Sequence, residues 1–191
     1  MSNVWIEMKD VSKSFFNNHV IKQMSITIEK NKTYLLKGEN GSGKSTFLKL
    51  IIDLYKPNHG LINRYYKDLR YVPEMIKIKS DITVQNYIIY ALALKNLNRD
   101  TALESLLELD LKKPLKHLSK GNQKKVLLYL AMVGEPEILC LDEPLDGLDV
   151  TMQKKVLTYL KDLNKTYIIS THAMRRFNKF EPKEVILFEV D

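Results

Sequence analysis

The chain has 191 residues, of which 45% are hydrophobic and 28% are charged, a balance typical of a soluble globular domain and not of a disordered chain. Its 30 Lys and Arg residues against 23 Asp and Glu residues give a formal net charge of +7, which suits phosphates, nucleic acid or an anionic membrane surface equally well. The longest apolar run, residues 87–94, is far shorter than the roughly 20 residues that a membrane-spanning helix needs, and the N-terminus lacks the pattern of a secretion signal.

The first predicted elements are antiparallel strands. Residues 1–30 alternate apolar and polar side chains, as in WIEMKDVS and MSITIE, the pattern of strands with one covered face. Residues 33–37 (TYLLK) are β-prone and apolar, whereas the run from 45 to 55 is helix-like and opens with Ser45 and Thr46. A glycine-containing loop therefore connects a strand to a helix.

Three of the seven glycines lie in this loop, within the stretch KGENGSGKST at 37–46. Glycine lets the main chain approach a ligand closely, at an entropic cost to folding. Gly38, Gly43, Lys44 and Ser45 match G-x-x-x-x-G-K-[S/T], the phosphate-binding loop; the alternative is a glycine-rich turn at a helix start. Loop amides would surround a β-phosphate, Lys44 would reach the β- and γ-phosphates, and Ser45 would ligate Mg²⁺. The expected nucleotide-binding residues are Gly38, Glu39, Asn40, Gly41, Ser42, Gly43, Lys44, Ser45 and Thr46.

Residues 75–117 are expected to form a helical lobe. A helix-like segment at 81–95 is opened by Asp81, and a second one at 100–111 is opened by Asp100. Most of the following apolar residues are expected to pack inside the lobe: Tyr87, Ile88, Leu92 and Leu94.

A lysine-rich run without acidic residues covers residues 112–125. Most such runs are solvated faces; lipid headgroups, an acidic partner loop and attraction of a nucleotide are the alternatives. The lysines are Lys112, Lys113, Lys116, Lys120, Lys124 and Lys125.

Two carboxylates follow the apolar run at 138–141, which reads as a buried parallel strand. Ligands of α/β sheets lie beyond the carboxyl ends of the strands, so this pair would meet the phosphates. Asp142 fits a partner of Mg²⁺, and Glu143 fits a base for the attacking water; the alternative is a strand-to-turn junction with solvated acids. Cys140 is the only cysteine, and we expect a buried core thiol in a reducing cytosol.

A last β-prone segment, TYIIS at 166–170, is followed by Thr171 and His172. A lone histidine is more often structural than catalytic, so the segment alone does not assign His172 a role. The other histidines match no motif and are expected at the surface or in packing: His19, His59 and His117.

The order of these motifs is specific. The glycine loop, L-S-x-G at 118–121, a strand with Asp-Glu-Pro, G-L-D and a strand ending in histidine follow one another. From about Met8 to Asp191 the chain resembles an ATP-binding-cassette (ABC) ATPase, the nucleotide-binding subunit of a transporter. The resemblance implies one α/β domain over 1–191: a P-loop NTPase, RecA-like core with a mainly parallel sheet and an N-terminal antiparallel part (about 1–74 and 118–191), and a small inserted helical lobe (about 75–117).

The resemblance also implies roles for particular residues. The family signature LSGGQ corresponds to LSKGN at 118–122, with Lys120 in place of glycine and Asn122 in place of glutamine. Ser119 and Gly121 would touch the γ-phosphate, and Ser119 is also a potential helix cap. His172 matches the switch histidine, which contacts the γ-phosphate. Asp149 matches the aspartate that links two ATP sites, with a helix cap as the alternative.

Two further positions carry less specific resemblance. Phe15 lies where the family places an aromatic residue that stacks on adenine, and Phe16 is the alternative. Glu74 stands where the family usually has a glutamine that touches Mg²⁺ and senses the membrane subunit; glutamate there resembles a compact exporter-type branch. Glu74→Gln is expected to keep ATP binding and to change the metal dependence or the coupling of turnover.

Together these features predict an ATPase that powers transport, with ATP and Mg²⁺ as cofactors. Its expected partners are a membrane-spanning permease and a second nucleotide-binding subunit, identical or not, and no nucleic acid; its expected place is the cytoplasmic face of the cell membrane. The predicted catalytic residues are Lys44, Glu143 and His172, and the predicted metal ligands are Ser45, Glu74 and Asp142. A soluble ABC-type ATPase acting on ribosomes or nucleic acid is the alternative, whereas a phosphate-loop kinase or GTPase has no need of the LSKG segment.

Overall fold

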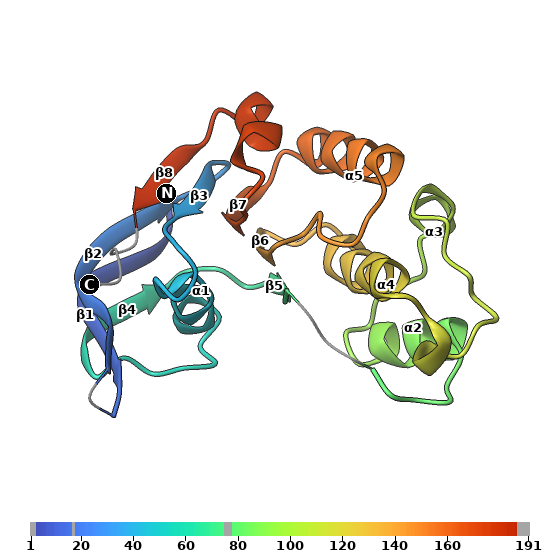
Figure 1. Ribbon diagram of the computed structural model, residues 1–191, viewed down its shortest axis with the longest axis horizontal. Helices are drawn as coiled ribbons and strands as arrows, with labels where there is room; N and C mark the ends of the chain where they lie inside the picture. The colour runs from blue at the N-terminus through green and yellow to red at the C-terminus, as the bar shows by residue number, and fades with distance from the viewer. Residues whose placement is uncertain (1–2, 17, 75–77, 187–191) are drawn as a thin grey trace. The chain divides into compact units, whose positions relative to one another are not determined.

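A computed structural model describes residues 3–16, 18–74 and 78–186 of the chain (Figure 1). Its contacts divide the chain into two compact units. Unit 1 contains residues 1–71, 137–142 and 165–191, and unit 2 contains residues 72–136 and 143–164.

The antiparallel part of unit 1 is a three-stranded sheet in the order β2-β1-β4. β1 (Val4–Phe15) pairs with β2 (Asn18–Glu29) on one side and with β4 (His59–Arg64) on the other. Ile6 and Met8 are buried two residues apart on β1, as the alternating pattern predicts. The antiparallel strands are thereby confirmed. β4 was not predicted, because HGLINR does not alternate and has no fully buried residue.

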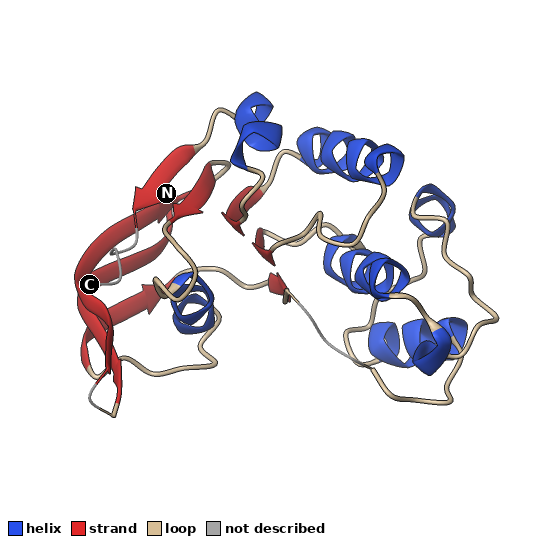
Figure 2. Cartoon of the chain, in the orientation of Figure 1, coloured by secondary structure: helices blue, strands red, loops and turns tan. Residues whose placement is uncertain are grey.

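The second sheet has the strand order β5-β6-β7-β3-β8, and Figure 2 shows both sheets in red. Its strands are β3 (Thr33–Lys37), β5 (Leu69–Val72), β6 (Ile138–Asp142), β7 (Thr166–Ser170) and β8 (Lys183–Ile186). β6, β7, β3 and β8 pair in parallel. Leu36 and Asp142 both lie opposite Ser170 in the register, so the carboxyl ends of β3, β6 and β7 share one edge.

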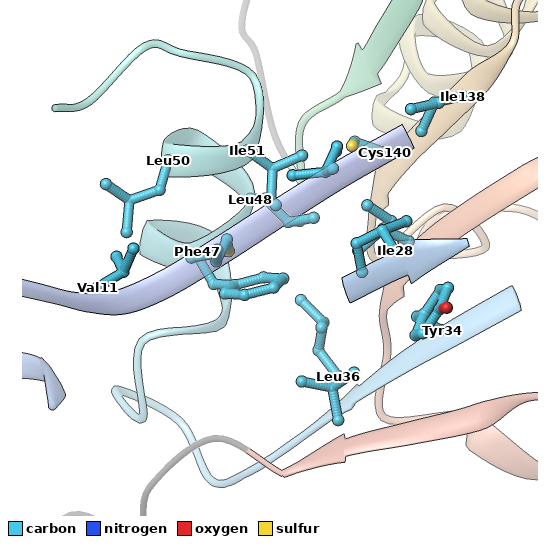
Figure 3. Packing of buried hydrophobic residues seen from close by; sticks show 14 of the residues in the cluster. Val11, Ile28, Tyr34, Leu36, Phe47, Leu48, Leu50, Ile51, Ile138 and Cys140 are labelled. Carbon is cyan, nitrogen blue, oxygen red and sulfur yellow. The ribbon is translucent and has the colours of Figure 1, made fainter. Parts of the chain in front are cut away.

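Helix α1 (Lys44–Ile51) supplies one part of a hydrophobic core in unit 1 (Figure 3). The helix is shorter than the predicted run to residue 55, since Arg64 donates hydrogen bonds to the carbonyls of Leu50 and Ile51 and so caps its C-terminal end. Cys140 lies in this core, and burial raises the pKa of its thiol. The core residues are Ile6, Met8, Val11, Ile21, Ile28, Tyr34, Leu36, Phe47, Leu48, Leu50, Ile51, Ile138, Cys140, Ile168 and Val185.

The helices of unit 2 begin at capping side chains. They are α2 (Val84–Ala93), α3 (Thr101–Leu106), α4 (Lys120–Met132) and α5 (Val150–Leu163), and a short 3₁₀ helix covers Leu115–His117. The caps are Thr83, Asp100, Ser119 and Asp149, and each accepts a hydrogen bond from the backbone N–H three residues later. The capping predictions for Asp100, Ser119 and Asp149 are confirmed.

The predicted start of α2 at Asp81 is wrong. Thr83 caps the helix through Oγ1, which accepts from the amide of Asn86 at 3.3 Å, whereas the carboxylate of Asp81 pairs with Lys116. α3 is also shorter than predicted, because the chain turns at Glu108 with a φ of 52°. The prediction that most apolar residues of α2 pack inside holds for Ile88 and Leu92, but Leu94 is 88% exposed.

Unit 2 is larger than the helical lobe expected from the sequence, because α4 and α5 cluster with α2 and α3. A polar network stabilises it internally. Glu104 accepts two hydrogen bonds from Arg99, at 2.8 and 2.7 Å, and a third at 3.2 Å from the buried Tyr129 hydroxyl. Within the described ranges no helix is both long and apolar enough to cross a membrane.

Candidate nucleotide-binding site

The glycine loop leaves β3 and enters α1 through backbone conformations that favour glycine. Gly41 has a φ of 85° and Gly43 a φ of 97°, in the left-handed region that L-residues rarely adopt. A Cβ atom on Gly43 would lie 2.9 Å from Cγ1 and 3.0 Å from the carbonyl oxygen of Val20. Glycine is therefore required at position 43 for two separate reasons.

Lys44 folds back over this loop. Its Nζ donates hydrogen bonds of 2.7 Å to the carbonyl oxygens of Gly38 and Glu39, and the residue is buried. The hydroxyl of Ser42 is buried and has no hydrogen-bond partner among the described residues. A loop that holds an ammonium group and an unsatisfied hydroxyl fits a phosphate, which accepts hydrogen bonds from both.

Two of the three predicted metal ligands, Ser45 and Asp142, lie in unit 1 and contact each other beside the glycine loop. Ser45 Oγ donates a 2.8 Å hydrogen bond to Oδ2 of Asp142, which is 3% exposed, and the Tyr71 hydroxyl lies 3.5 Å from the same oxygen. Oxygen ligands of this kind fit Mg²⁺, which keeps several waters and also uses substrate phosphates. In the described part of the chain no three His, Cys, Asp or Glu residues form a metal site.

Glu143 and His172 follow the ends of β6 and β7. Glu143 has a left-handed φ of 44°, and its carbonyl accepts the amide of Asp146 at 3.2 Å, so the chain turns sharply after Asp142. His172 is exposed two residues beyond Ser170, which lies opposite Asp142 in the sheet. Thr171 is buried, and its Oγ1 accepts the amide of Ala173 at 3.0 Å, which fixes the backbone on both sides of His172.

The aromatic pair precedes this loop in unit 1. Phe15 ends β1, and its ring contacts the Tyr55 ring edge-to-face at a centroid distance of 5.3 Å. Phe16 follows with a φ of 51° and is fully exposed. The three histidines without a motif are exposed, as expected.

The signature segment lies in unit 2, at the start of α4. Ser119 caps the helix, with its Oγ 3.2 Å from the amide of Asn122. A Cβ atom on Gly121 would lie 2.2 Å from the carbonyl oxygen of Gly147, so only glycine allows the helix to pack on the turn at 143–148. Asp149 caps α5 by accepting the amide of Met152 at 2.9 Å.

This order of phosphate loop, capped signature helix and strand-end acids agrees with the sequence comparisons. The family described as ABC transporter matches residues 21–146. The chain belongs to the ABC transporter family. The P-loop NTPase fold predicted from the sequence is confirmed.

Individual relatives support the same assignment. The chain is 32% identical over 192 residues to the spermidine/putrescine import ATP-binding protein PotA of Acetivibrio thermocellus, a match that covers 89% of this chain and 54% of that protein. It is 33% identical over 155 residues to the zinc import ATP-binding protein ZnuC of Buchnera aphidicola subsp. Baizongia pistaciae, covering 76% and 63%. A solved ATP-binding subunit of an ABC transporter superposes with a TM-score of 0.88 at 26% identity, covering 97% of this chain and 88% of that one. The chain thus spans roughly half to two thirds of the length of these curated relatives.

All three departures from the ABC motifs lie in unit 2. Asn122, in place of glutamine, donates its backbone amide to the Ser119 cap. Lys120, in place of glycine, forms an ion pair of 2.5 Å with Asp146. Glu74, in place of glutamine, is exposed, and its backbone carbonyl accepts a hydrogen bond from Lys124.

The lysine run is therefore not a uniform solvated face. Lys116 and Lys120 pair with Asp81 and Asp146, while Lys124 and Lys125 are buried. No individual role was predicted for Asp146 or Lys124. Asp146 directly precedes the G-L-D motif at 147–149, which was the only pointer to it. Lys124 was one of six lysines in the run, and the sequence does not distinguish it from the others.

Proposed function

We propose that the chain binds Mg·ATP and hydrolyses it as the ATP-binding subunit of an ABC transporter. The observation that carries this proposal is the contact between Ser45 and Asp142, 2.8 Å apart beside the loop over which Lys44 lies. These groups come from segments almost 100 residues apart in the chain and meet where an α/β sheet binds its ligands.

Each of the following groups has a chemical role in this proposal. Loop amides and Lys44 hold the phosphates, while Ser45 and Asp142 would hold Mg²⁺, which offsets the charge that develops on the phosphates. Glu143 accepts the proton of the attacking water, or orients that water, at the end of β6. His172 would contact the γ-phosphate from the end of β7.

A second copy or a related subunit would complete the site. Ser119 and Gly121 of one copy would contact the γ-phosphate held by the other, and Asp149 would link the two ATP sites. The Ser119 cap leaves further amides of the first turn of α4 available to an anion. ATP would hold two copies together, and hydrolysis would release them.

The free energy of ATP binding and hydrolysis would drive a membrane-spanning permease, to which the chain would bind at the cytoplasmic face of the membrane. Unit 2 exposes apolar side chains on and around α2 that suit such a partner: Ile82, Ile89, Tyr90 and Leu94. Export, predicted from Glu74, stays a prediction, since the two relatives described above are named for import. Vesicles reconstituted with the permease distinguish the directions by the side on which cargo accumulates.

Comparing two lysine variants of α1 tests the proposal. Lys44→Ala is expected to lower the rate of Mg·ATP hydrolysis by about 100-fold, because it removes a preorganised cation from the phosphates. Lys49→Ala, on the same helix, removes the same charge away from the loop and should leave the rate near that of the wild type. Equal rates for the two variants, or no hydrolysis by the wild type with and without permease, would contradict the proposal.

A further inference from the structure

Lys124 is a buried cation in the second turn of α4. The residue is 2% exposed, and its Nζ donates hydrogen bonds of 2.9 Å to the carbonyl of Pro73 and 2.8 Å to the carbonyl of Glu74. An ammonium group is buried only where hydrogen bonds replace its lost hydration. These two hydrogen bonds therefore hold residues 73–74, which follow β5, against α4.

The same helix turn carries the signature. Lys124 lies one turn after Lys120 and Gly121, so residues 73–74 are held close to the end of α4 that presents Ser119. The pKa of Lys120 is raised, mainly by its hydrogen bond with Asp146 and to a smaller extent by the negative charge of Glu74. The Glu74 side chain thus lies within electrostatic reach of this first turn.

We propose that Lys124 is a positioning residue for Glu74, which it couples to the signature end of α4. The inference rests on the proposed function, in which α4 presents Ser119 and Gly121 to ATP, and on the prediction from the family resemblance that Glu74 is a metal ligand. If the metal or the permease displaces Glu74, the displacement would be transmitted to α4 through the two hydrogen bonds that the buried Lys124 side chain donates to residues 73 and 74.

The neighbouring lysine provides a matched control. Lys125 is also buried on α4, but its Nζ lies 3.8 Å from Glu108, which keeps a second partner in Lys155 at 2.6 Å. Lys124→Met and Lys125→Met remove the same charge from the same helix. Lys124→Arg keeps the charge and the donors, and serves as the rescue.

Two measurements separate positioning from general stability. Lys124→Met is expected to speed hydrogen exchange of the backbone between Tyr71 and Glu74 in the nucleotide-free protein, and to raise the Mg²⁺ concentration for half-maximal ATP hydrolysis by about 10-fold. Lys125→Met should change neither, and Lys124→Arg should restore most of both. Glu74→Gln should change the Mg²⁺ dependence in the wild type but not further in Lys124→Met.

The inference is overturned if the two Met variants behave alike, or if Glu74→Gln has its full effect in Lys124→Met. If Lys124→Met does not fold, the same comparison is made between Lys124→Gln and Lys125→Gln, where equal behaviour overturns it too. Hydrogen exchange needs no hydrolysis, so a wild type that does not cleave ATP contradicts the proposed function while exchange still tests the contact.

Discussion

Phe15 and Phe16 are adjacent but differ in how much freedom their rings have. Phe15 is held by the Tyr55 ring and by Lys13, whose Nζ lies 5.1 Å from the Phe15 ring centroid, and it is still 38% exposed. Phe16 is fully exposed and has no ring contact among the described residues. Placing Phe16 on a base would cost more side-chain entropy, so the structure favours Phe15 for stacking.

Phe15→Ala is expected to weaken ATP binding by about 10-fold, because stacking of a base on an aromatic ring is lost. Binding of tripolyphosphate, which has no base, should not change. Calorimetric titration of both ligands checks this, with Phe16→Ala as the control. Weaker ATP binding by Phe16→Ala alone would assign the base to Phe16 instead.

Packing at the start of α4 makes a prediction about a single glycine. Alanine normally stabilises a helix relative to glycine, but a Cβ on Gly121 would lie 2.2 Å from the Gly147 carbonyl oxygen. Gly121→Ala is therefore expected to destabilise the protein by about 1–3 kcal/mol through overpacking. Thermal unfolding should show a lower Tm than for Asn122→Ala in the same turn; an unchanged or higher Tm would contradict the packing.

The cap of α5 makes a prediction about pH. The pKa of Asp149 is lowered from 3.8, chiefly by the hydrogen bond from the Met152 amide. A lowered pKa in the folded state means that the charged cap stabilises the protein above pH 3.8 and that this contribution is lost as the pH falls through the lowered pKa. Urea unfolding should show Asp149→Ala less stable than wild type near neutral pH, with a gap that closes in acid. Asp162→Ala, on the same helix, is the control, and a gap independent of pH would contradict the cap.

The elements that could be predicted carry their determinants within their own sequence. β3, β6 and β7 are continuous apolar runs, and Asp100, Ser119 and Asp149 have the side chains that cap helices. β4, β5 and β8 could not be predicted, because short strands of mixed composition depend on the neighbours with which they pair. Thr83 caps α2 in place of Asp81, because the carboxylate of Asp81 pairs with Lys116. Lys116 is distant in sequence, so this pairing could not be predicted.

The candidate site was predictable to a similar extent. The predicted parallel sheet implied that Asp142 lies at the same phosphate site as Ser45, and the two side chains form a hydrogen bond. The partners of Lys120 and Lys124 could not be predicted, because the distances that join them to Asp146 and Glu74 arise only in the folded unit. The roles of these residues in catalysis stay predictions.

For the whole molecule, the proposed function requires two copies of the chain or of related subunits. The phosphate loop lies in unit 1 and the signature serine in unit 2, and the proposal assigns them to ATP sites shared between copies. Glu143→Gln should stop hydrolysis without affecting the loop, so that ATP remains bound and the copies remain together.

Light scattering of purified Glu143→Gln with and without Mg·ATP tests this most directly. If two copies share each ATP, the mass is 22.3 kDa without nucleotide and twice that mass with it, and the mass does not double when Lys44→Ala is added. A mass that stays at 22.3 kDa with saturating Mg·ATP at high protein concentration would contradict the sharing of ATP sites between two copies.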